Sequence, residues 1–110
     1  MMVFEKAKEL AKEITLSKEY KELVDSKYKL DEDKVAKKLM EDMIVLQKEY
    51  VKTLKENFDK DTMKSMENIL KNKHQEVLEN NVTHTYIKTR ENFDKFMKKI
   101  NNVISEGIKI

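Results

Sequence analysis

The stretch VAKKLMEDMIVLQKEYVKTLKENF, residues 35–58, carries two apolar stripes at helical spacing. Both stripes advance in alternating steps of three and four residues, which places each along one line of a helix surface. One stripe contains Ala36, Leu39, Met43, Leu46 and Tyr50, and the other contains Met40, Ile44, Gln47, Val51, Leu54 and Phe58. A helix on the surface of a small monomer needs only one such stripe. Two stripes therefore predict two packing partners, the rest of the chain and a second copy of it.

The composition extends this helical pattern to the whole chain. Its 110 residues include no proline and one glycine, Gly107, so the usual residues of turns and hairpins are nearly absent. Charged residues make up 40% and apolar residues 39%, a mixture typical of helices with one or two buried faces. We expect residues 1–110 to form a single all-α domain. Its predicted architecture is an antiparallel helical bundle of about four helices, with long second and fourth helices, which dimerises through helix faces.

Polar residues at three places predict where helices begin and end. Ser17 follows the first apolar stripe, at a place where its hydroxyl can restart or bend the helix. Asp31 and Asp33 predict the start of the next helix, because a carboxylate there meets free amides and the positive end of the helix dipole. Residues 80–81, Asn-Asn, are the clearest break in the second half of the chain.

Several classes of protein are disfavoured by what the chain lacks. The 23 basic and 21 acidic side chains leave a net charge of +2, which does not favour binding to nucleic acid or to an anionic membrane. Without cysteine there is no disulfide and no thiolate ligand for a metal or an iron–sulfur cluster. No segment has the length and hydropathy of a transmembrane helix, and no signal-peptide pattern opens the chain. We expect a cytoplasmic protein without a cofactor and without membrane insertion.

Residues of the double-stripe helix are the best candidates for a dimer or partner interface. Methionine at an interface suits an adaptable binding surface, although methionine at helical spacing also fills ordinary cores. Met40 and Met43 lie on different stripes and are the strongest candidates of this kind. The predicted interface comprises Met40, Met43, Ile44, Gln47, Val51, Leu54 and Phe58.

Catalytic and metal-binding patterns are hard to find. The two histidines, His74 and His84, are ten residues apart and separated by the Asn80-Asn81 break, so they lack the i,i+4 spacing of helical metal ligands. The carboxylates lie among lysines, where solvation is the default, and no serine sits in a nucleophile-elbow pattern. We expect no enzymatic activity and no metal site.

The alternative function is nucleic-acid binding by the last helix. Its basic residues are Lys88, Arg90, Lys95, Lys98 and Lys99. Single-strand binding would pair such a surface with exposed stacking aromatics. Here Tyr86, Phe93 and Phe96 share the predicted core stripe, and acidic residues interrupt the positive charge, so a solvated face is the simpler interpretation.

The two ends of the chain resemble the YlbF/YmcA/YheA family. The opening VFEKAKELAKEI, residues 3–14, followed by SKEYK, residues 17–21, is similar to that family's "A-x-x-L-A-x-x-I" helix and its "S-x-E-Y" restart. The closing FDKFMKKINNVISEGI, residues 93–108, resembles the family's terminal helix, which ends "V-N-x-I-I-S-E-A-I". Between them, Leu46-Gln47 stands where the family has an "L-Q" step.

This resemblance implies a small helical, commonly dimeric cytoplasmic protein. Two branches of the family are non-catalytic subunits of a complex that affects competence, sporulation, biofilm formation and messenger RNA maturation, and a third branch is largely uncharacterised. The complex-forming branches hold iron–sulfur clusters through cysteines, which this chain lacks. Gly107 also replaces the usual alanine before Ile108. The resemblance leaves open which branch this chain belongs to.

Overall fold

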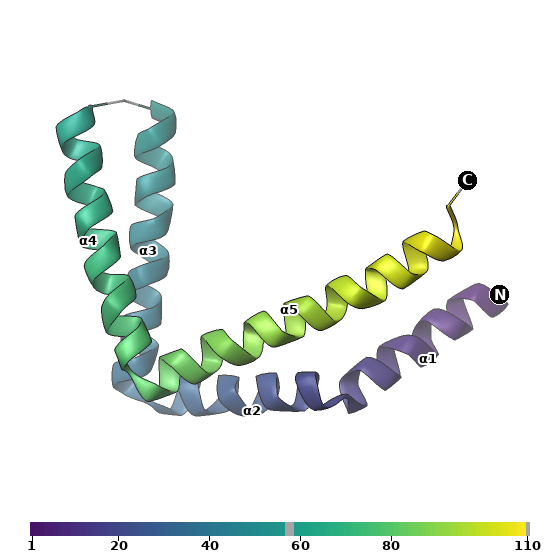
Figure 1. The fold of residues 1–110 in the computed structure, drawn as a ribbon. Helices are drawn as coiled ribbons and strands as arrows, with labels where there is room; N and C mark the ends of the chain where they lie inside the picture. Colours follow the sequence, from purple (N-terminus) through teal and green to yellow (C-terminus); the bar gives the residue numbers. More distant parts are fainter. Residues whose placement is uncertain (57–58, 110) are drawn as a thin grey trace. The chain divides into compact units, whose positions relative to one another are not determined.

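The computed structural model describes residues 1–56 and 59–109, and all regular structure in these ranges is helical (Figure 1). The helices in chain order are α1 (Met2–Leu16), α2 (Lys18–Glu32), α3 (Lys34–Glu56), α4 (Lys60–Glu79) and α5 (Asn81–Gly107). The all-α prediction is confirmed. The predicted number of about four helices is too low for the described residues, because the first predicted apolar segment ends at Ser17 and the chain restarts there as a separate helix.

Ser17 separates α1 from α2 by serving both helix ends. Its backbone is extended, with φ −69° and ψ 153°. The Ser17 Oγ donates to the Ile14 carbonyl at 2.6 Å and accepts from the Tyr20 amide at 3.2 Å. One hydroxyl thus satisfies a free carbonyl of α1 and a free amide of α2, which is why two helices meet here without glycine or proline.

The starts of α3, α4 and α5 are also capped by short polar side chains. Asp33 Oδ1 accepts from the Ala36 amide at 2.9 Å, and Asn80 Oδ1 accepts from the Val82 and Thr83 amides at 3.0 and 3.1 Å. Asp59 caps α4, and hydrogen bonds from the Thr62 hydroxyl and the Asp61 amide hold the pKa of the Asp59 carboxyl below its usual value. Of the two predicted caps before α3, Asp33 is the one that caps it, whereas Asp31 lies within α2.

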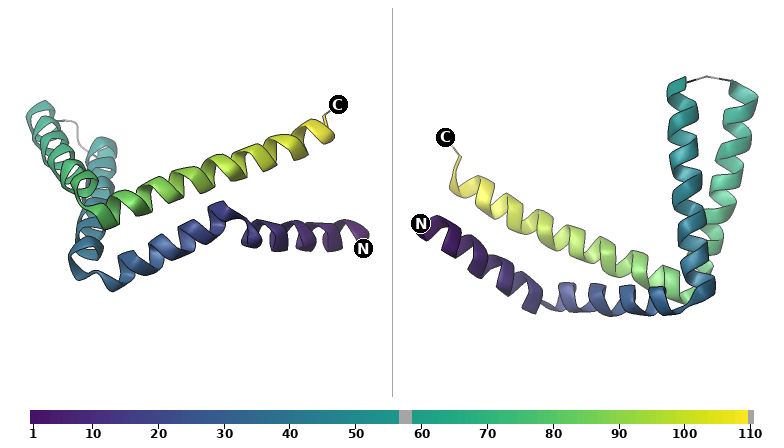
Figure 2. Two further views of the ribbon diagram at one scale, coloured as in Figure 1. Left: turned by 60° about the horizontal axis from the view of Figure 1, so that its bottom comes forward. Right: turned by 180° about the vertical axis from the view of Figure 1, so that it is seen from behind.

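Residues 29–85 form one compact unit, in which α3 and α4 run antiparallel as a helical hairpin (Figures 1 and 2). Val77 and Thr83 are fully buried in this unit. The Thr83 hydroxyl donates to the Val77 carbonyl at 2.5 Å, so its burial leaves no unpaired donor. The buried apolar residues of this unit are Leu30, Ala36, Met40, Met43, Met63 and Val77.

Residues 1–28 and 86–110 make up the second compact unit, whose described residues come from α1, most of α2 and most of α5. In it the Tyr20 and Phe93 rings lie 5.9 Å apart between centroids, and Phe93 lies 6.4 Å from Phe96. The Ser26 and Thr89 hydroxyls are hydrogen-bonded at 2.5 Å, with Ser26 only 2% exposed. These contacts fix the register of α2 against α5, while α1 contains no buried residue. The single domain predicted from the sequence stays a prediction.

Candidate protein-interaction surface

The two apolar stripes of α3 differ in how far they are buried in the hairpin. In the first stripe Ala36 and Met43 are buried, and Leu39, Leu46 and Tyr50 are half-buried. Among the described residues of the second stripe, only Met40, at the N-terminal end, is buried. Ile44, Val51 and Leu54 remain 41%, 48% and 45% exposed, and Gln47 is exposed between them. One stripe therefore packs within the chain, and most of the other faces outward.

The exposed stripe, defined here as Ile44, Gln47, Val51 and Leu54, is the part of the predicted interface that the structure leaves open. Met40 and Met43, the two methionines favoured from the sequence, are each 7% exposed and lie in the chain's own packing. Phe58, the last predicted interface residue, lies outside the described residues. Three large apolar side chains within eleven residues of one helix form an exposed hydrophobic patch, whose contact with water is unfavourable.

Three lysines accompany the exposed stripe along one edge. Lys48, Lys52 and Lys55 line the same shallow groove as Ile44, Gln47 and Val51, with a volume of about 470 Å³. Sequence reasoning did not single these lysines out. Their spacing of four and three residues, parallel to the stripe, is the signal that could have found them.

A second groove, of about 360 Å³, lies on the other flank of the stripe, between α3 and α4. Gln47 and Tyr50 line it from α3, and Glu67, Leu70, Lys71 and His74 line it from α4. The Tyr50 hydroxyl donates to Glu67 Oε1 at 2.9 Å. This bond to the carboxylate raises the pKa of the Tyr50 phenol above its usual value, helped by slight desolvation and by the charge of Glu67.

The Tyr50–Glu67 bond predicts a pH dependence that mutation can remove. Because its pKa is raised in the folded state, the contribution of Tyr50 to stability is complete below the ordinary phenol pKa of about 10 and is lost as pH rises through the folded value. We expect Glu67→Gln to move the Tyr50 titration back toward the ordinary value. Ultraviolet titration, with Tyr50→Phe used to assign the phenol, measures this. An unchanged Tyr50 titration in Glu67→Gln would contradict the assignment.

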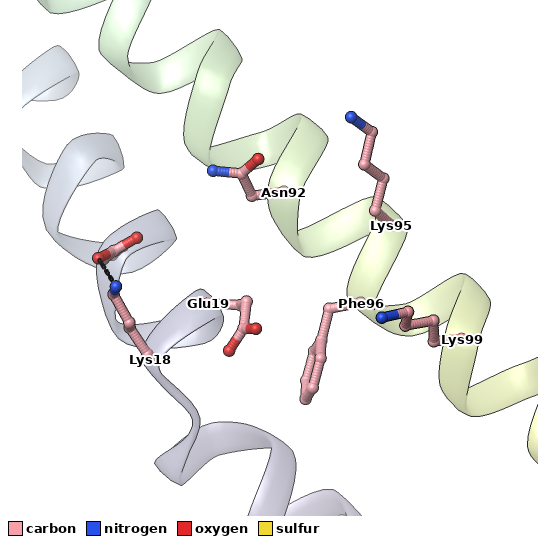
Figure 3. A pocket seen from close by; sticks show the side chains of 7 residues that line it. Lys18, Glu19, Asn92, Lys95, Phe96 and Lys99 are labelled. Carbon is pink, nitrogen blue, oxygen red and sulfur yellow. Dashed lines mark ion pairs between the residues drawn. The ribbon is translucent and has the colours of Figure 1, made fainter.

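The second unit carries a groove of about 620 Å³ between α2 and α5, shown in Figure 3. Its lysines are Lys18, Lys95 and Lys99, and its carboxylates are Glu19 and Glu22. Lys18 pairs with Glu22 at 3.8 Å. The Phe96 ring and the Asn92 amide complete the lining. Its charge is thus mixed, unlike that of the groove lined by Lys48, Lys52 and Lys55 on α3.

The basic residues considered for nucleic acid do not gather around stacking aromatics. Lys88, Arg90, Lys95, Lys98 and Lys99 are all exposed on α5, but only Lys95 and Lys99 line the groove of Figure 3. The neighbouring rings are engaged within the unit. Phe93 contacts Tyr20 and Phe96, and the Lys27 ammonium lies 5.9 Å from the centre of the half-buried Tyr86 ring. Tyr86, Phe93 and Phe96 are each only partly exposed, so none of these three rings of α5 is fully open for a base to stack on.

The described residues contain no group of three or more His, Cys, Asp or Glu side chains placed to hold a metal ion. His74 lines the groove beside Tyr50, and His84 is exposed near the start of α5. Among the described helices, none combines the length and the hydropathy needed to cross a bilayer.

Comparison with known proteins places the chain in a family. A family model described as control of competence regulator ComK, YlbF/YmcA, matches residues 3–109. No curated protein sequence gives a significant match. Among solved structures, the crystal structure of Bacillus subtilis RicA in complex with RicF superposes with a TM-score of 0.76 over 98% of this chain and 97% of that one, at 15% identity. The RicA likeness is one of fold, and the family match spans nearly the whole sequence. The chain therefore belongs to the YlbF/YmcA family.

Proposed function

We propose that this chain is a non-catalytic subunit of a cytoplasmic regulatory complex and acts by binding other helical proteins. The observation that carries the proposal is the exposed stripe, since three large apolar side chains stay open on a helix whose other stripe is already packed. Apolar surface of this kind, rimmed by charged residues, marks protein–protein contact sites.

Two comparisons support this function. The family to which the chain belongs is described as controlling the competence regulator ComK, a regulatory role. RicA, a protein of similar fold, was solved in complex with RicF. By extension we propose that the complex formed by this chain affects RNA processing, competence, sporulation or biofilm formation, as the family resemblance implies. The missing cysteines mean that this chain contributes no thiolate to an iron–sulfur cluster.

We also propose that the chain can form a homodimer through the same surface. Two copies that bury the exposed stripe against each other would cover Ile44, Val51 and Leu54. The unit of residues 1–28 and 86–110 carries further open apolar side chains that a larger assembly could cover, with Val3 and Phe4 61% and 62% exposed on α1 and Val103 74% exposed on α5.

Affinity capture from native cells tests the proposal. The tagged chain is compared with Leu54→Glu, which charges the exposed stripe, and with Val45→Glu, which charges a 52% exposed valine off that stripe. We expect specific protein partners that resist nuclease, that persist in Val45→Glu and that are lost in Leu54→Glu. The nucleic-acid alternative would be favoured if nuclease treatment abolished capture and if charge reversal of the basic residues of α5 abolished it as well. These residues are Lys88, Arg90, Lys95, Lys98 and Lys99. Partners retained equally by all three proteins would contradict the assigned surface.

A further inference from the structure

The charge along the exposed stripe indicates what kind of helix it binds. Lys48, Lys52 and Lys55, called the lysine edge here, line one groove with three residues of the stripe, Ile44, Gln47 and Val51. Among the described residues none of these three lysines forms an ion pair within the chain. Within the described part of the chain these three ammonium groups lie in a row beside the apolar stripe without an ion-pair partner, so they are available to carboxylates of a binding partner.

The opposite flank of the stripe does not offset this charge. Lys71 and His74 stand there with one carboxylate, Glu67, which already accepts the Tyr50 hydroxyl at 2.9 Å. A partner helix lying on the stripe would thus meet three lysines on its outer side and a further lysine on its inner side.

A second copy of the chain is a poor match for this pattern. If a two-fold axis perpendicular to α3 relates two copies, each edge of the stripe lies beside its own equivalent, because the contact is isologous. The lysine edge of one copy would then face the lysine edge of the other. If the axis runs along α3, the lysine edge faces the flank that holds Lys71 and His74. The first arrangement brings like charges together, which weakens the pairing at low salt. The second sets the three lysines against a flank with one lysine and one carboxylate, which already accepts the Tyr50 hydroxyl, so neither arrangement supplies a row of acidic residues.

We propose that the preferred occupant of the exposed stripe is an amphipathic helix of a different protein, with acidic residues along one edge of its apolar face. This rests on the proposed function, because it names the partner of the same surface. The residues from Ile44 to Leu54 span three helical turns, so the partner helix needs at least that length. Acidic residues four and three positions apart along its edge reach the lysine edge, while its apolar residues cover Ile44, Val51 and Leu54.

Two synthetic helical peptides test the proposal. Both carry leucines at positions i, i+3, i+7 and i+10, and they differ only in three flanking residues, glutamate in one and lysine in the other. Fluorescence anisotropy of the labelled peptides with the full chain measures binding. We expect the glutamate peptide to bind about tenfold more tightly at low salt, as three exposed ion pairs would give. We expect this preference to vanish in high salt.

Charge reversal on the chain provides the matched comparison. In the triple variant Lys48→Glu, Lys52→Glu, Lys55→Glu we expect the peptide preference to reverse. The control Lys88→Glu, Lys95→Glu, Lys98→Glu changes net charge by the same amount on exposed residues of α5 and should keep the wild-type preference. Circular dichroism establishes that both variants are folded, and the salt dependence of the wild type gives a second readout that needs no variant.

The possible failures separate this proposal from the proposed function. Equal binding of both peptides, abolished by Val51→Glu, would overturn the charge selection and leave the interaction surface in place. If neither peptide bound, and if Val51→Glu left the association of the chain unchanged, both the charge selection and the proposed interaction surface would be overturned. Binding to phosphatidylglycerol vesicles that the triple lysine variant loses, without any peptide preference, would assign the surface to lipid and overturn the proposal.

Discussion

Val51→Glu is expected to weaken the association of the chain, with itself or with a captured partner, by about a hundredfold. Val51 is 48% exposed in the middle of the exposed stripe, so an interface there would bury the new carboxylate among Ile44, Leu54 and the partner's apolar side chains. Burying a charged group in an apolar contact costs about 3 kcal/mol, which corresponds to that loss of affinity.

The fold itself should tolerate this change. A glutamate at position 51 stands four residues before Lys55 and three after Lys48, and both are favourable spacings for surface ion pairs on a helix. Sedimentation equilibrium over a concentration series gives the association constant, and circular dichroism gives the helix content. A folded Val51→Glu protein that associates like wild type would contradict the assignment.

Val45→Glu is the matched control for this prediction. It is a valine in the same helix, 52% exposed, and about 120° away from Val51 around the helix axis. We expect its association constant to change by less than about threefold, since surface substitutions outside an interface usually cost under about 0.5 kcal/mol. Equal losses in both valine variants would mean that α3 uses a different face.

Val77→Asp is expected to destabilise the α3–α4 hairpin by about 4 kcal/mol, enough to unfold much of the protein. Val77 is 0% exposed, and its carbonyl accepts the hydroxyl of the buried Thr83. A carboxylate at this position loses its hydration, because the side chain at position 77 is fully buried. The cost also includes the lost contacts of the valine methyl groups.

Urea unfolding followed by circular dichroism measures this effect. Ile69→Asp is the control, because Ile69 lies on the same helix and is 49% exposed. We expect it to cost less than about 1 kcal/mol. If Val77→Asp unfolded at the same urea concentration as Ile69→Asp, the packing described for the hairpin would be wrong.

The helices of this protein follow closely from local sequence signals. The apolar spacing of residues 35–58 predicts a helix, and α3, which runs from Lys34 to Glu56, covers residues 35–56 of that range. The breaks at Ser17, Asp33 and Asn80 also coincide with observed caps. These features depend on residues within one turn of each other, so the sequence contains the information directly.

The surface could be predicted only in part, because it depends on distant residues. Both stripes of α3 have the same spacing, and only the placement of α4 decides that Ala36 and Met43 are covered while Val51 is left open. The Ser26–Thr89 bond joins residues 63 positions apart, which no local pattern reveals. The spacing of the lysine edge can be read from the sequence. Its role in binding can be inferred only once the neighbouring stripe is known to be exposed.

Thiol labelling gives the most direct test that the exposed stripe is the partner-binding surface. The chain contains no cysteine, so Gln47→Cys places a single thiol at the centre of the stripe, and Val45→Cys places one off it. Maleimide labelling rates are compared for the free chain and the associated chain. The account predicts that association slows labelling at position 47 by at least about tenfold, as burial under a packed partner requires, and leaves position 45 unchanged. Equal labelling of position 47 in the two states, with association verified by mass, would contradict it.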